Sequence, residues 1–86
     1  MEDIVIVSAA RTAVGKFGGT LAKTPATQLG AAVIADVLRR SGLEAGQVGE
    51  VIMGQVLAAG AGQNPARQSV LKSGLNQGTP GLTINA

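Results

Sequence analysis

The sequence has 86 residues and a mass of 8.5 kDa, which allows one small domain with a thin core. One Phe is the only aromatic residue, and this excludes the stacking surfaces of many RNA- and single-stranded-DNA-binding domains. The sequence holds no Cys and no His, so it offers no Cys/His zinc site, disulfide, thiol nucleophile or imidazole base. The net charge of +2 comes from dispersed residues and indicates neither a nucleic-acid partner nor a membrane surface.

The first residues do not resemble a targeting signal. Glu2 and Asp3 are acidic where a secretory signal peptide is basic. The apolar run over residues 4–10 is far shorter than the roughly 20 residues that a membrane span needs. We therefore expect a soluble, cytoplasmic chain with no metal centre.

The first expected element is a strand over about residues 3–10. Residues 4–7 are all β-branched and show no polar alternation, which is typical of a strand covered on both faces in a parallel sheet. Residues 11–24 follow as a loop with several glycines, and we expect Phe17 to pack this loop against an apolar surface.

A helix is expected next, over about residues 25–41. Pro25 suits a first helical position, Leu29, Val33 and Val37 repeat at helical spacing, and Gly42 suits a left-handed stop. A second buried strand is expected over about residues 50–57, and Gly54 within it predicts that another part of the chain packs closely there.

The last two expected elements are a helix over about residues 65–73 and a strand over about 82–85. Asn64 can cap this helix and Gly74 can end it. The resulting order of strand, helix, strand, helix, strand predicts an α/β fold with parallel strands and crossover helices.

This predicted architecture is incomplete by itself. Right-handed crossovers place both helices on one face of the sheet, so the other face would lie bare. Parallel sheets are normally covered on both faces. We therefore expect residues 1–86 to be part of a larger fold or to need a partner.

The candidate site residues are Gln63, Asn64, Arg67 and Asn85, which lie near expected strand ends. Loops after the carboxyl ends of strands are where α/β proteins collect their ligand sites, so these residues are candidates to support a pocket or a dimer contact. The structural alternative is a helix cap at Asn64 followed by a solvated first turn. Composition alone leaves both interpretations open.

Two stretches of the sequence resemble the thiolase family. Residues 4–19 read IVIVSAARTAVGKFGG and resemble the opening of thiolases. Residues 50–57 read EVIMGQVL and lead into GAGQNPARQ at 60–68, in the order and spacing of the same family. The similarity is greatest to the biosynthetic thiolases of bacteria, and it covers essentially the whole chain.

The resemblance implies a larger enzyme that condenses two acetyl-CoA into acetoacetyl-CoA and CoA, or runs the reverse thiolysis. Family members have two similar halves whose sheets stack through shared helices, and they form dimers or tetramers. Coenzyme A thioesters are their substrates, and no other cofactor is implied. The expected partners are the remainder of the thiolase chain, further copies of it and acyl-CoA.

The resemblance also implies that no catalytic residue lies within residues 1–86. The family's nucleophilic cysteine stands in a V-C-G-S-G-type motif shortly after a strand like residues 82–86, and its other catalytic residues come later. Residues 82–86 would then aim the nucleophile. Two alternatives are open: a related condensing enzyme of the same superfamily, and a truncated, non-catalytic module that docks onto a partner.

Overall fold

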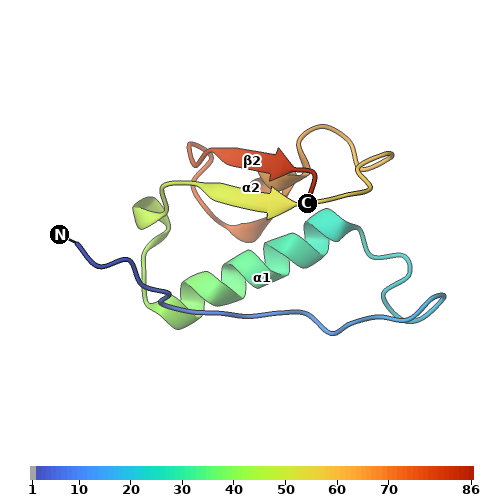
Figure 1. Cartoon of the computed structure of the whole chain (residues 1–86), viewed down its shortest axis with the longest axis horizontal. Coiled ribbons are helices and arrows are strands. Elements are labelled where there is room, and N and C mark those ends of the chain that lie inside the picture. The colour runs from blue at the N-terminus through green and yellow to red at the C-terminus, as the bar shows by residue number, and fades with distance from the viewer. Residues whose placement is uncertain (1) are drawn as a thin grey trace.

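The computed structural model describes residues 2–86 as a small α/β structure (Figure 1). It contains two helices, α1 and α2, a short 3-10 helix η1, and two strands, β1 and β2. Their bounds are Ala26–Ser41 for α1, Ala45–Gln47 for η1, Val51–Gly54 for β1, Pro65–Ser73 for α2 and Gly81–Ile84 for β2. The predicted α/β class with parallel strands and a crossover helix is confirmed.

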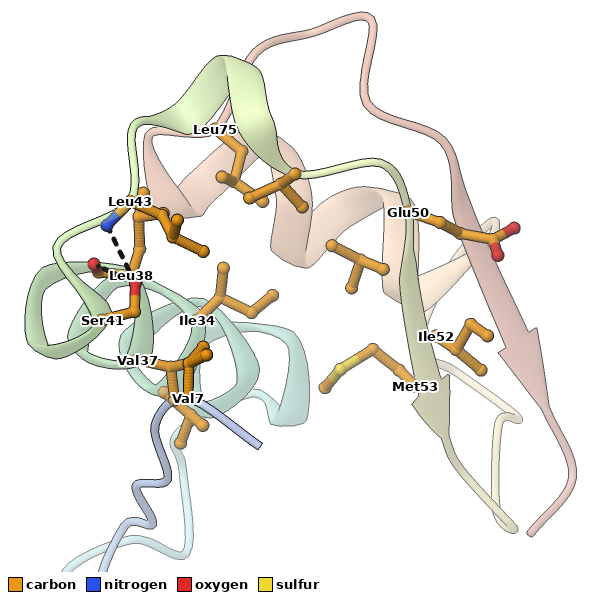
Figure 2. Close-up of a pocket in the computed structure, with 13 residues that line it drawn as sticks. Val7, Ile34, Val37, Leu38, Ser41, Leu43, Glu50, Ile52, Met53 and Leu75 are labelled. Carbon is orange, nitrogen blue, oxygen red and sulfur yellow. Dashed lines mark hydrogen bonds between the residues drawn. The ribbon is translucent and has the colours of Figure 1, made fainter. Parts of the chain in front are cut away.

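β1 and β2 pair in parallel, with Ile52 opposite Leu82 and Met53 opposite Thr83. Met53 points toward the helices and Ile52 points away from them (Figure 2). Side chains on the far face are exposed, with Ile52 at 56% and Leu82 at 47%. The face opposite the helices is therefore bare within the described residues, as the crossover argument predicted.

The core lies where α2 packs between the sheet and α1. Ala66 and Val70 of α2 are fully buried, and Ala31 of α1 is almost so. The two helices approach closely at Gly30, where an added Cβ would lie 2.7 Å from Ser69 Oγ. Ser69 Oγ also donates a hydrogen bond of 2.9 Å to the main-chain oxygen of Thr27, which joins α2 to the start of α1.

The strand predicted over residues 3–10 is not formed. These residues run beside α1 in an extended path (Figure 1), held by Ser8 Oγ donating to Val37 O at 2.8 Å. Ile4 is 99% exposed and Ile6 91%. β-branched residues favour an extended backbone, but a strand also needs a ladder partner, and this path lies beside a helix.

The following segment is also unpacked. Phe17 is fully exposed, so the expectation that it packs the loop onto an apolar surface is wrong. The turns over residues 16–24 are closed by local backbone bonds, such as Gly19 N to Lys16 O at 2.9 Å. Residues 2–24 therefore form the least packed part of the described chain.

The other four elements lie near their predicted positions. α1 begins one residue after Pro25, which occupies the N-cap position, and ends at Gly42 with φ of 74°. α2 has the predicted bounds, and β2 is shifted by one residue. β1 is shorter than the predicted 50–57, since it ends at Gly54 and the chain bends at Val56. Neither helix of residues 2–86 combines the length and apolar character that crossing a membrane requires.

Candidate functional site

The carboxyl ends of β1 and β2 lie side by side and form the candidate site. Gln55 N, just after β1, donates a hydrogen bond of 2.8 Å to Ile84 O at the end of β2. A Cβ on Gly54 would lie 2.8 Å from the main-chain oxygen of Ala86, so the close approach predicted at this glycine is present. The loop after β1 and the residues after β2 therefore leave the sheet at the same edge.

Asn64 joins the start of α2 to β2, which it contacts at Gly81, the first residue of the strand, and at Thr83. Its Oδ1 accepts hydrogen bonds from Arg67 N at 3.3 Å, as a helix cap, and from Thr83 Oγ1 at 2.7 Å. Its Nδ2 donates to Gly81 O at 3.0 Å. Thr83 Oγ1 in turn accepts from Ala66 N at 2.9 Å, so one hydroxyl bridges the strand and the first turn of the helix.

Asn64 adopts a left-handed backbone conformation with φ of 38°, which Asn tolerates better than most residues. The sequence identified the cap but not its bond to Thr83. Thr is common in strands because of its high β-propensity, so its presence in β2 does not by itself indicate a contact with Asn64.

Arg67 braces the connection that leads into β2. Its guanidinium donates to the main-chain oxygen of Gln77 and, at 3.3 Å, to that of Thr79. Thr79 is 5% exposed, so this connection is anchored in the interior. In residues 2–86 the Arg67 side chain therefore holds main-chain carbonyls of its own chain.

Gln63 and Asn85 are exposed on either side of Asn64 and Thr83. The main-chain oxygen of Gln63 accepts from Gln68 Nε2 at 2.9 Å, and the same amide nitrogen donates to Ala61 O at 2.7 Å. Gln68, which would lie on a solvated first turn in the structural alternative, is half-buried and braces the Gly-rich loop. A role of Gln63, Asn64, Arg67 and Asn85 in a pocket or dimer contact stays a prediction.

A polar pocket of about 430 Å³ lies beside this edge, between the start of α1, the loop after β1 and α2. Its polar groups are bonded to the chain itself: Lys72 Nζ donates to Thr27 Oγ1 at 2.9 Å, and Gln55 Nε2 donates to Leu57 O at 3.2 Å. This pocket therefore presents side chains that are already engaged.

A second, apolar groove of about 280 Å³ separates α1 from β1 (Figure 2). Val7, Ile34, Val37 and Met53 line it, and Glu50 is its acidic group. The apolar side chains of α1 that line this groove, such as Ile34 and Val37, are only half-buried, because no third strand covers them within residues 2–86.

The polar side chains of the described residues hold parts of the chain in place, and none of them is an evident reactive group. No cluster of three or more His, Cys, Asp or Glu side chains that could hold a metal occurs among them. Asp36 has a pKa below its ordinary value, because Arg39 donates to its carboxylate and Arg40 lies beside it. This ion pair stands in the last turns of α1, whereas the pocket beside the strand ends meets the first turn.

The described residues form a small α/β structure with two parallel strands whose ends lie side by side. Residues 4–86 match the thiolase N-terminal domain, and the chain belongs to this family.

Its curated relatives include enzymes named acetyl-CoA acetyltransferase. The chain is 66% identical to the one from Cupriavidus necator over 85 residues, which is 99% of this chain and 22% of the relative. It is 62% identical to the one from Pseudomonas aeruginosa and 55% identical to the one from Escherichia coli, each over 85 residues with the same shares. The chain thus spans about a fifth of the length of these relatives.

Proposed function

We propose that residues 1–86 are the amino-terminal part of an acetyl-CoA acetyltransferase. The enzyme would condense two acetyl-CoA into acetoacetyl-CoA and CoA, or run the reverse thiolysis. The observation that carries this proposal is the 66% identity to the Cupriavidus necator acetyl-CoA acetyltransferase across 99% of the chain.

The reaction would proceed through a cysteine that follows Ala86 in the complete polypeptide. Its thiolate attacks the acetyl carbon of the first acetyl-CoA, the bond from that carbon to the CoA sulfur breaks, and CoA leaves with a proton. A base then removes an α-proton from the second acetyl-CoA. The resulting carbanion attacks the acetyl-cysteine, which forms acetoacetyl-CoA and returns the thiolate.

Residues 1–86 would help to position the reacting groups for this chemistry. Support comes from the strand ends, since the Gln55 N to Ile84 O bond places the residues after β2 beside the loop that follows β1. Ligand sites of α/β proteins gather at such edges. Gln63, Asn64, Arg67 and Asn85 would form the scaffold of the nearby pocket or of a subunit contact.

The proposal extends to substrates and partners. Coenzyme A thioesters are the substrates, and no further cofactor is required by the reaction as written. The remainder of the polypeptide would cover the exposed face of the sheet around Ile52 and Leu82, because parallel sheets are normally covered on both faces. The assembled enzyme is proposed to be a cytoplasmic homotetramer, arranged as a dimer of dimers.

The proposal is tested with the protein purified from its source. Denaturing mass spectrometry comes first, and a mass far above 8.5 kDa is expected. The same material should cleave acetoacetyl-CoA only when CoA is added, which distinguishes thiolysis from hydrolysis. Incubation with acetyl-CoA should acetylate one cysteine peptide.

Other outcomes of this experiment contradict the proposal. An active acyl-cysteine without CoA-dependent cleavage of acetoacetyl-CoA would favour another condensing enzyme of the superfamily. A folded species of 8.5 kDa without a companion chain would favour the non-catalytic docking module.

A further inference from the structure

We propose that Asn64 and Thr83 form a latch that sets the position of the catalytic nucleophile. The latch is the pair of side chains together with their bonds to Gly81 O and Ala66 N. This inference rests on the proposed function, in which the nucleophilic cysteine follows Ala86. Asn64 and Thr83 are positioning residues, because they would act through the strand end and not on the substrate.

The latch ties β2 to the start of α2 at Gly81, the first residue of the strand, and at Thr83, the residue before its last. Asn64 bonds β2 at two points, with Nδ2 on Gly81 O at 3.0 Å and Oδ1 on Thr83 Oγ1 at 2.7 Å. Thr83 Oγ1 also accepts a hydrogen bond from Ala66 N in the first turn of α2, at 2.9 Å. These three bonds fix the position of β2 along the axis of α2, and they fix the rotation of β2 about its own axis.

The same strand end is held against β1 from the other side. Gln55 N donates to Ile84 O at 2.8 Å, and Gly54 lies so close to Ala86 that a Cβ would have no room. The residues after β2 are thus located between two fixed elements. A change in the latch would turn the strand end about the β1 contact and carry the following residues with it.

The latch is specific to its side chains. Thr83→Val keeps the shape of the side chain but leaves Ala66 N without its partner, and Asn64 Oδ1 keeps only its bond from Arg67 N. Thr83→Ser keeps the hydroxyl and so both bonds. Asn64→Gly removes all three side-chain bonds of Asn64 but permits the observed φ of 38°, so the loss is not confounded by backbone strain.

The test measures thiolysis by the complete enzyme carrying these changes. We expect Thr83→Val to lower kcat by about 10- to 100-fold, as misplacement of a reacting group by about 1 Å does, with KM nearly unchanged. Asn64→Gly should lower kcat by about 10-fold, because Ala66 N keeps its bond to Thr83. Thr83→Ser should recover most of the lost rate. The rate at which iodoacetamide alkylates the nucleophile should show a shifted pH profile in Thr83→Val.

Ser69→Ala is the control, because it removes a different hydroxyl bond made by α2, one that is buried and leads to Thr27 in α1. It should lower the thermal midpoint while leaving kcat and the alkylation profile as in the wild type. A folded Thr83→Val or Asn64→Gly enzyme with wild-type kcat and alkylation profile would overturn the latch. A wild-type enzyme without thiolysis would overturn the proposed function instead, so the two failures are distinguishable.

Discussion

Two regions of this chain share an apolar composition but differ in structure. Residues 51–84 form β1, α2 and β2, which pair, cap and bury one another around Val70. Residues 2–24 contain a run, residues 4–7, that is more β-branched than either strand, yet Val5 is 70% exposed and no strand is formed there. Within residues 51–84 each strand pairs with the other, whereas the run in residues 2–24 lies along helix α1.

The comparison teaches that β-propensity describes how well a residue fits a sheet that already exists. Val51–Gly54 becomes a strand because Gly81–Ile84 offers its carbonyls and amides in register. Residues 4–7 pair with no strand among the described residues, and the segment is held beside α1 by Ser8 Oγ, which donates to Val37 O.

The largest effect is expected from proline at backbone donors. Gln55→Pro removes the amide that donates to Ile84 O and should destabilise the 86-residue chain by about 3 kcal/mol. Val5→Pro should change stability by less than about 0.5 kcal/mol, since the segment is exposed and unpaired with a strand. Urea unfolding of both variants measures the difference, and a large loss from Val5→Pro would show that the first segment belongs to the sheet.

Truncation of side chains should show the same contrast. Val70→Ala removes two methyl groups from a fully buried site and should lower the free energy of unfolding by about 2 kcal/mol. Val5→Ala serves as the matched control and should stay within about 0.5 kcal/mol of wild type. Equal losses in urea unfolding would contradict the assignment of the core to α2.

The close approach of α1 and α2 gives a third contrast. A Cβ at Gly30 meets Ser69 Oγ at 2.7 Å and Met53 Cε at 2.9 Å, so Gly30→Ala should destabilise by about 1 kcal/mol despite the better helix propensity of Ala. At Gly15, within residues 2–24, the nearest atom is Leu21 Cβ at 3.4 Å. Gly15→Ala should therefore be neutral in thermal unfolding, and a loss there equal to that of Gly30→Ala would contradict this packing difference.

The smallest effect concerns the ion pair of α1 that borders the first segment. Arg39 and Arg40 hold the pKa of Asp36 below its ordinary value, and Arg40 also donates to Ala9 O at 3.2 Å. A carboxyl with a lowered pKa stabilises the fold above its ordinary pKa, and the contribution is lost as the pH falls through the lowered pKa. Wild type should be slightly more stable than Asp36→Asn at neutral pH and equal to it in strong acid; a constant difference across the pH range would contradict this assignment.

Much of the candidate site could be anticipated from local signals. The Asn-Pro pair at 64–65 marks a helix start, and Gly54 marks a close approach, and both features are present in the structure. The bonds of Asn64 to β2 could not be anticipated, because Thr83 lies 19 residues away along the chain. The contacts of Gln68 could not be anticipated either, because its two carbonyl partners come from the irregular loop over residues 58–63, for which no periodicity exists.

The sequence by itself determined the α/β class, the two helices with their glycine stops, and the thiolase family, because caps, periodicity and motifs are local along the chain. Only the tertiary structure decided which β-branched runs become strands and which polar side chains join separate elements. A ladder needs a neighbour at about 5 Å and a hydrogen bond needs a partner in reach, and both depend on how distant segments pack. For that reason residues 4–7 stay unpaired in this structure, whereas Asn64 and Thr83 meet.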